Sequence, residues 1–146
     1  MPERAFHVYR ITAAELAKIK QEPYPDVDIK IDDPYNLVYH REEFYSPISE
    51  LTQNCIDQGA TQVRVKVGQR KMVVEDNIHH SDAKKLAERL NRDRVKTTKP
   101  TDPEWGFAWG GIGILSCRRI FAKLGGKLNY YPTEDNRVIA VATWLR

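Results

Sequence analysis

The sequence has few cysteines, no long apolar run and no dense cluster of one charge. Its two cysteines, Cys55 and Cys117, lack the Cys-x-x-Cys spacing of a thiolate metal site. A disulfide is not expected in a reducing compartment, so both are interpreted as small core residues. No apolar stretch approaches the roughly 20 residues needed to cross a bilayer. We therefore expect neither a disulfide framework nor a membrane partner.

Targeting signals and a strong charge bias are also missing. The N-terminus, Met-Pro-Glu-Arg-Ala-Phe-His, does not have the basic-then-apolar layout of a secretory signal, so a cytoplasmic location is expected. A net charge of +3 over 146 residues is too small to indicate nucleic-acid binding, which usually needs a dense basic patch. With 41% hydrophobic and 29% charged residues, the composition is typical of one globular domain spanning residues 1–146.

Hydrophobic spacing and stop signals predict alternating helices and strands. Thr12 and Glu15 form a capping box for a helix that ends near Gln21, within an N-terminal helical extension over residues 1–25. Because the predicted strands follow one another in pairs, the expected fold class is α+β, a two-layer sandwich with a mixed, mostly antiparallel sheet and helices on one face. Further helices are predicted over 41–58, 82–91 and 113–124, and strands over 27–31, 62–67, 71–75, 127–131 and 138–145.

The predicted helix over 41–58 carries the first indication of a functional site. At about 100° per residue, an apolar stripe runs from Phe44 to Cys55, whereas Glu50, Asn54 and Asp57 group on a separate face. Oxygen atoms on such a face suit Mg²⁺, and a carboxylate there can orient or deprotonate water. The alternative is the solvated polar face of an amphipathic helix.

The order of residues around this helix resembles the ATP-binding domain of the GHKL superfamily. That superfamily groups DNA gyrase, the MutL proteins, a heat-shock chaperone and the histidine kinases. The resemblance depends on Glu50-Leu-Thr-Gln-Asn54-Cys-Ile-Asp57, then Gly59-Ala-Thr and two strands, the second ending at Asp76. The glycine-rich turn, apolar helix and Gly-Gly stop between Trp109 and Gly126 are similar to the histidine-kinase version. The resemblance covers roughly residues 27–146 and implies the Bergerat-type ATP-binding fold.

The resemblance implies a role for each matching residue. Asn54 would ligate the Mg²⁺ that bridges the phosphates of ATP, with Asp57 on the same helix face in the nucleotide-binding set. Glu50 would be the general base or would orient the attacking water. Asp76 would accept a hydrogen bond from the adenine amino group. A carboxylate there would select adenine over guanine, because guanine presents a carbonyl at that position and two acceptors would face each other. A plain strand-end turn is the alternative.

The second glycine box of the family matches Gly111 and Gly113. Glycines there would let backbone amides approach phosphate at the start of a helix. The alternative is an ordinary entry from a loop into a helix. Between Ile78 and Trp109 lies the position of the family's ATP lid, which in this chain is rich in lysine and arginine.

Departures from the family pattern leave the function open. The family reads Asp-x-Gly-x-Gly, but this chain has Asp76-Asn-Ile78-His-His80, and Ile78 and His80 would crowd the route to the adenine pocket. His79 and His80 are not expected to bind metal, because no third ligand is apparent. The only early histidine, His7, has no phosphoacceptor helix around it, so the chain resembles a stand-alone domain similar to the anti-sigma-factor serine kinases.

Two functions remain open from the sequence. The first is a regulatory domain that binds ATP and Mg²⁺ and acts on a protein partner, which it could phosphorylate. The second is a degenerate domain with weak or no nucleotide binding that serves as an interaction or dimerisation module, for example as a homodimer. Glu50, Asn54, Gly111 and Gly113 favour the first, and Ile78 and His80 favour the second.

Overall fold

A computed structural model of the chain describes residues 10–92 and 109–146, with side chains in the second range described from 113 onward. Most of the expected ATP lid, residues 93–108, lies outside the described residues. The elements are α2 (Ala13–Gln21), β1 (Asp28–Asp32), α3 (Leu37–His40), the 3-10 turn η1 (Glu42–Phe44), α4 (Tyr45–Asp57), β2 (Gln62–Val67), β3 (Lys71–Asp76), α5 (Ala83–Leu90), α6 (Trp109–Lys123), β4 (Lys127–Pro132) and β5 (Val138–Thr143).

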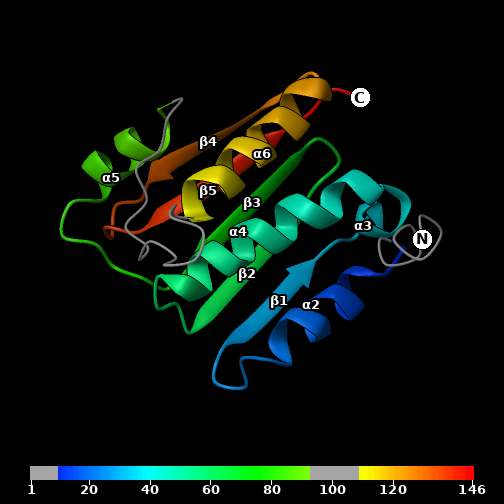
Figure 1. Cartoon of the computed structure of the whole chain (residues 1–146), viewed down its shortest axis with the longest axis horizontal. Coiled ribbons are helices and arrows are strands. Elements are labelled where there is room, and N and C mark those ends of the chain that lie inside the picture. Colours follow the sequence, from blue (N-terminus) through cyan, green and yellow to red (C-terminus); the bar gives the residue numbers. More distant parts are fainter. Residues whose placement is uncertain (1–9, 93–108) are drawn as a thin grey trace.

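The strands form a five-stranded sheet in the order β1-β2-β3-β5-β4. β1 and β2 are parallel, and the other neighbouring pairs are antiparallel. Figure 1 shows α4 and α6 side by side across one face of this sheet, with α2 beside β1. The predicted α+β class, with a mixed and mostly antiparallel sheet and helices on one face, is confirmed.

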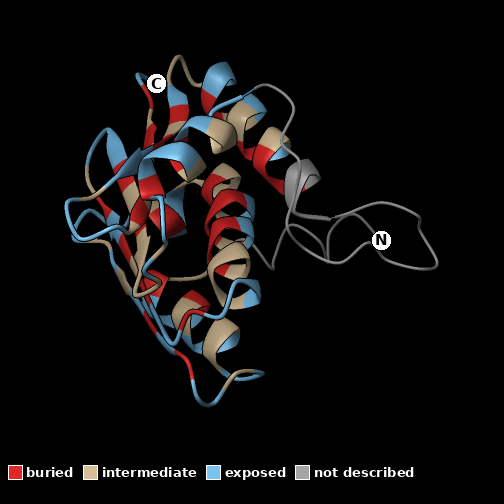
Figure 2. Cartoon of the chain, turned by 90° about the vertical axis from the view of Figure 1, so that its left-hand side faces the viewer, coloured by how far each residue is buried: buried red, intermediate tan, exposed pale blue. Residues whose placement is uncertain are grey.

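Alternation along the strands separates the sheet into a covered and an open face. In β2, Val63, Val65 and Val67 are buried, as are Met72 and Val74 in β3. The register pairs Val65 with Val74 and Val67 with Met72, so these side chains lie on the same face. Figure 2 shows the buried residues gathered between the helices and the sheet. Period-two spacing thus defines the core side of the sheet.

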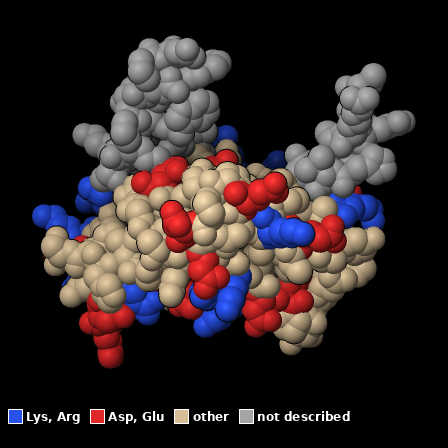
Figure 3. Space-filling model, turned by 90° about the horizontal axis from the view of Figure 1, so that it is seen from below, with Lys and Arg blue, Asp and Glu red and all other residues tan. Residues whose placement is uncertain are grey.

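The open face carries charged side chains in neighbouring strands. Arg64 Nη2 lies 2.7 Å from Asp28 Oδ2, and Lys66 Nζ lies 3.2 Å from Glu75 Oε1. Such partly exposed pairs contribute about 0–1 kcal/mol each, so they specify strand pairing more than they stabilise it. On the side of the molecule seen from below, acidic and basic residues are likewise interspersed (Figure 3).

An aromatic cluster joins the two helices to the C-terminal strand. Phe44 and Trp144 have ring centroids 4.7 Å apart, and Phe121 lies 6.0 Å from Trp144. Both phenylalanines are fully buried. Burying each ring contributes about 1.5–3 kcal/mol, which fixes α4 against α6. Cys117 is fully buried, as predicted, whereas Cys55 is half-buried and packs against the core.

Local signals set the ends of α2 and α4. Glu15 N donates to Thr12 Oγ1 and Thr12 N donates to Glu15 Oε1. Each donor–acceptor distance is 3.2 Å, which confirms the capping box. The continuous helix predicted over 41–58 is wrong, because α4 begins only at Tyr45, after α3 and η1. The reason is Pro47, which has no N–H and is tolerated only in a first helical turn. Gly59 ends the helix with a φ of +100°, which side chains disfavour.

Both edge strands are capped by an amide side chain. Gln21, at the end of α2, accepts from Ile29 N over 2.8 Å and also donates to Val27 O. Asn91, after α5, accepts from Tyr130 N over 2.6 Å and donates to Tyr130 O over 2.8 Å. Unpaired edges are templates for aggregation, so these amides occupy backbone groups that another strand would otherwise use.

Candidate functional site

Two of the predicted site residues lie on the flank of α4 that faces α6. The Glu50 carboxylate reaches the backbone of α6 at Gly113. Asn54 is four residues further along α4, so its half-buried side chain lies on the same flank, one turn away. Glu50 itself remains exposed to solvent on one side. The two side chains therefore lie on the side of α4 that faces α6.

Asp57, near the end of α4, takes part in a hydrogen-bond network with Gln53. Its Oδ1 accepts from Gln53 Nε2 over 2.8 Å, and the same nitrogen donates to Tyr24 Oη over 2.9 Å. Lys20 Nζ donates to Gln53 Oε1 over 3.1 Å. Burial lowers the pKa of Lys20, and the charges of Glu50 and Asp57 oppose that shift. Asp57 thus takes part, through Gln53, in the network that joins α4 to α2.

Gly113 makes room for the Glu50 carboxylate. A Cβ atom at this position would lie 2.5 Å from Glu50 Oε2 and 3.3 Å from its Cδ, so any side chain there would displace the Glu50 carboxylate. One turn further on, burial raises the pKa of the Cys117 thiol to about 12, and the Glu50 charge adds to the rise. The carboxylate therefore lies beside the first half of α6.

The glycine box lies inside a helix, so the predicted start of that helix at Gly113 is wrong. α6 begins at Trp109, four residues earlier. The first four N–H groups of a helix have no intrahelical acceptor, and Gly111 is among them. Gly113 is the fifth residue, so its N–H falls within the intrahelical pattern. Gly111 can offer an amide to an anion, whereas Gly113 provides space.

Asp76 ends β3 on the face that the helices cover. It pairs with Val63, whose side chain is completely buried, so both side chains lie on the covered face. Its Oδ1 accepts from Ile78 N over 2.8 Å. This bond turns the chain sharply after the strand.

The turn after Asp76 needs no glycine. Ile78 is half-buried and packs against the core. Within the described ranges, the only non-glycine residues with a positive φ are Asn36 and Asn136, so Ile78 and His80 have ordinary backbone angles. His80 N donates to Asn136 O over 2.7 Å. The chain therefore takes a path here that differs from a glycine-rich turn and is attached to the β4–β5 hairpin.

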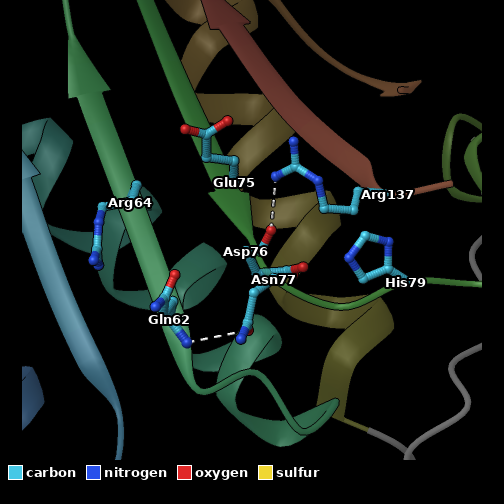
Figure 4. A pocket seen from close by; sticks show the side chains of 7 residues that line it. All are labelled: Gln62, Arg64, Glu75, Asp76, Asn77, His79 and Arg137. Carbon is cyan, nitrogen blue, oxygen red and sulfur yellow. Dashed lines mark hydrogen bonds between the residues drawn. The ribbon is translucent and has the colours of Figure 1, made fainter. Parts of the chain in front are cut away.

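A hollow of about 250 Å³ lies at the end of the sheet, next to the backbone of Asp76 (Figure 4). Arg137 Nη1 donates to Asp76 O over 3.0 Å, and Arg64 lies across the hollow on β2. Sequence reasoning missed this group, although the alternation of polar residues with valines in β2 pointed to an open polar face. The lining residues are Gln62, Arg64, Glu75, Asp76, Asn77, His79 and Arg137.

Two other features bear on the chemistry available. Among residues 10–92 and 109–146, no group of three or more His, Cys, Asp and Glu side chains is arranged to hold a metal ion. Mg²⁺ in nucleotide sites usually keeps several waters and takes one or two protein oxygens, so a full protein cage is not needed. None of the described helices combines the length and apolar character that crossing a bilayer requires.

Several solved structures share this arrangement of elements at low sequence identity. The ATP binding domain of PrrB from Mycobacterium tuberculosis superposes with a TM-score of 0.58 at 12% identity, over 92% of each chain. The catalytic domain of histidine kinase ThkA gives 0.52 at 17% identity, over 88% of this chain and 90% of its own. The cytoplasmic segment of histidine kinase QseC gives 0.51 at 14% identity, over 93% and 76%.

Sequence comparison adds no closer relationship. No protein-family model matches the chain, and a search of curated proteins finds no significant match. At identities of 12–17% the structural likeness establishes the architecture and not the activity. The shared sheet, helix order and coverage nevertheless agree with the GHKL resemblance read from the sequence. This chain therefore has the α+β fold of the histidine-kinase ATP-binding domains.

Proposed function

We propose that this domain binds an adenine nucleotide with Mg²⁺ between α4, α6 and the end of β3, and regulates a protein partner. The observation that supports the proposal is the contact of the Glu50 carboxylate with Gly113, because it brings the first and last sequence signatures next to each other. Asn54 lies one turn from Glu50 on α4, and Asp76 lies on the face of the sheet that the helices cover.

The residues present fit such a ligand. Asp76 would accept from an adenine amino group through Oδ2, while its Oδ1 accepts from Ile78 N. The amide of Gly111, in the first turn of α6, would donate to a phosphate. Asn54 would hold Mg²⁺ through its amide oxygen, and that ion would neutralise phosphate charge. Glu50 would orient a water molecule or remove its proton.

Binding and turnover can be separated by two substitutions. Asn54→Ala should abolish the Mg²⁺-dependent part of ATP affinity, whereas Glu50→Ala should leave affinity largely intact. Any hydrolysis or transfer to a partner should fall about 10²–10⁴-fold in Glu50→Ala, which is the usual contribution of a general base. Unchanged turnover in Glu50→Ala would make Glu50 a solvated helix residue.

A second candidate is an interaction or dimerisation module with weak or no nucleotide binding. It is favoured by Ile78, whose half-buried side chain stands where the family has a glycine. In that case the residues around Glu50 and Gly113 would bind no nucleotide, and a partner or a second copy of the chain would bind elsewhere.

Thermal unfolding with ATP, ADP and GTP, each with and without Mg²⁺, distinguishes the two candidates. A nucleotide at 100 times its dissociation constant adds about 2.7 kcal/mol, a clear shift for a domain of this size. ATP and ADP should raise the melting temperature and GTP should not. Equal shifts with ATP and GTP would contradict the role of Asp76, and no shift with any nucleotide would favour the interaction module.

A further inference from the structure

Asp76 lies beyond the end of the backbone ladder between β3 and β5, although it still pairs with Val63 of β2. The ladder between β3 and β5 ends at the pair Val74 and Ala140, two residues before Asp76. Beyond that pair, the carbonyl of Asp76 accepts from Arg137 Nη1 over 3.0 Å (Figure 4). A side-chain bond thus continues the attachment of β3 to the β5 side of the sheet after the backbone ladder has ended.

Arg137 is itself held in the β4–β5 hairpin. Its Nε donates to Asp135 Oδ2 over 2.8 Å, and its backbone N donates to Thr133 Oγ1 over 3.0 Å. Hydrogen bonds from Thr133 and Arg137 lower the pKa of the Asp135 carboxyl, which keeps this anchor ionised. Because a planar guanidinium presents several donors in fixed directions, one side chain can bind both Asp135 and the Asp76 carbonyl.

The same hairpin also holds the turn that follows Asp76. His79 Nδ1 donates to the carbonyl of Asp135 over 2.8 Å, and His80 N donates to the carbonyl of Asn136 over 2.7 Å. Three consecutive hairpin residues, 135–137, therefore hold three points of the segment 76–80. This attachment replaces the freedom that glycines would give the turn.

On its other side, the turn is fastened to the start of β2. Asn77 Oδ1 accepts from Thr61 N over 3.0 Å and from Gln62 N over 3.1 Å, and Asn77 Nδ2 donates to Thr61 Oγ1 over 2.7 Å. With Asn77 fixed on one side and Arg137 on the other, the backbone of Asp76 has little freedom. Its carboxylate orientation is then set by the bond from Ile78 N.

We propose that Arg137 is a positioning residue for Asp76 and sets base selectivity from the open face of the sheet, without touching the nucleotide. The inference rests on the proposed function, in which Asp76 recognises adenine. Its physical content is the Arg137–Asp76 bond: without it the turn 76–80 loosens, and the carboxylate samples orientations in which guanine is no longer excluded.

The test uses Arg137→Ala, Arg137→Lys and the matched control Arg64→Ala. Arg64 lines the same hollow, and its side chain is 29% exposed against 27% for Arg137. The Arg64 side chain donates to the Asp28 carboxylate and to the backbone carbonyls of Asp28 and Val63, and none of these residues belongs to the turn. Two properties are measured on the full chain: amide exchange of Ile78 and His80 without nucleotide, and the ratio of ATP to GTP affinity.

In Arg137→Ala, exchange at Ile78 and His80 should accelerate about tenfold, and the ATP-to-GTP affinity ratio should fall about tenfold, the effect of one net hydrogen bond. Arg137→Lys should give intermediate values, because a single ammonium can replace only part of the fork. Arg64→Ala should change neither property. The selectivity ratio matters because a merely structural loss would weaken both nucleotides equally.

The two hypotheses can fail separately. If the natural chain binds neither ATP nor GTP, the proposed function is wrong, and the exchange rates still decide whether Arg137 holds the turn. If ATP binds with its selectivity unchanged in Arg137→Ala, the positioning role is overturned while the function stands. Equal acceleration of exchange in Arg137→Ala and Arg64→Ala, or acceleration spread over the whole sheet, would also overturn it.

Discussion

At the scale of single residues, the site depends on how closely two helices approach each other. Gly113 lacks a side chain at the point where the Glu50 carboxylate meets α6. Cys117, one turn further on, is completely buried and also senses the Glu50 charge. The same carboxylate therefore influences packing, electrostatics and, in the proposed function, chemistry.

Gly113→Ala tests this close approach. Alanine is favoured over glycine in a helix by about 1 kcal/mol, but here its methyl group would displace the Glu50 carboxylate. In urea unfolding, we expect Gly113→Ala to gain about 1 kcal/mol less in the natural background than in Glu50→Ala. Glu50→Asp, which shortens the side chain, should relieve most of the difference. Additive effects of the two substitutions would mean that the carboxylate does not contact Gly113 in solution.

Cys117 should make stability pH-dependent on the alkaline side. Its pKa is raised from 9.0 to about 12 by burial, so the folded state keeps a proton that the unfolded state loses. The contribution of Cys117 to the free energy of unfolding is therefore fully present below pH 9 and is lost between pH 9 and about 12. From pH 8 to pH 10 the loss should be about 1.4 kcal/mol by urea unfolding. Cys117→Ala should remove that slope, and a slope that persists would assign it to other groups.

At the scale of elements, each edge strand of the sheet is bound by an amide side chain from the end of a neighbouring helix. Gln21 binds the backbone of Ile29 in β1, and Asn91 binds the backbone of Tyr130 in β4. Pro132, at the end of β4, has no N–H to offer another strand. The ends of α2 and α5 thus cover backbone groups at both edges of the sheet, although neither helix contributes to the proposed nucleotide site.

Removing either amide should both destabilise the domain and expose an edge. Gln21→Ala and Asn91→Ala each break two side-chain bonds to an edge strand, which should cost about 1–3 kcal/mol in urea unfolding. Light scattering should show more self-association at high protein concentration. Gln69→Ala, at an exposed residue of the β2–β3 turn, is the control and should change neither. Unchanged stability in both edge variants would contradict the capping role.

At the scale of the whole molecule, α2 is integrated into the domain. Leu16 is fully buried in the core, and the Lys20–Gln53 bond joins α2 to α4. Within the expected N-terminal helical extension over 1–25, the helix α2 therefore packs beside β1 of the same sheet as the proposed site. The network that contains Asp57 depends on this helix as well.

Deleting residues 1–25 should therefore weaken the whole domain. Loss of the buried Leu16 side chain and of the Gln21 cap should cost about 3 kcal/mol or more. That corresponds to a fall in melting temperature of about 10 °C, measured by calorimetry. Leu16→Ala in the full chain is the companion variant and should account for about 2–5 kcal/mol. A truncated chain that melts like the full one would show α2 to be dispensable.

The sequence by itself determined the features that depend on neighbouring residues. The Thr12–Glu15 capping box, the alternation of β2 and β3, and the helix stop at Gly59 all follow from local geometry, and the structure contains each of them. The α+β class follows in turn from the order of those elements. Local rules failed at Pro47 and at Trp109, where competing start signals lie within one or two turns of each other.

Only the tertiary structure decided which side chains meet. The contact of Glu50 with Gly113, the bond from Arg137 to Asp76 and the network that takes Asp57 toward α2 join segments far apart in the chain. Periodicity assigns a residue to a face of its own helix or strand, but it carries no information about the neighbour packed against that face. That neighbour is chosen by the packing of the whole core, where every side chain competes for the same volume.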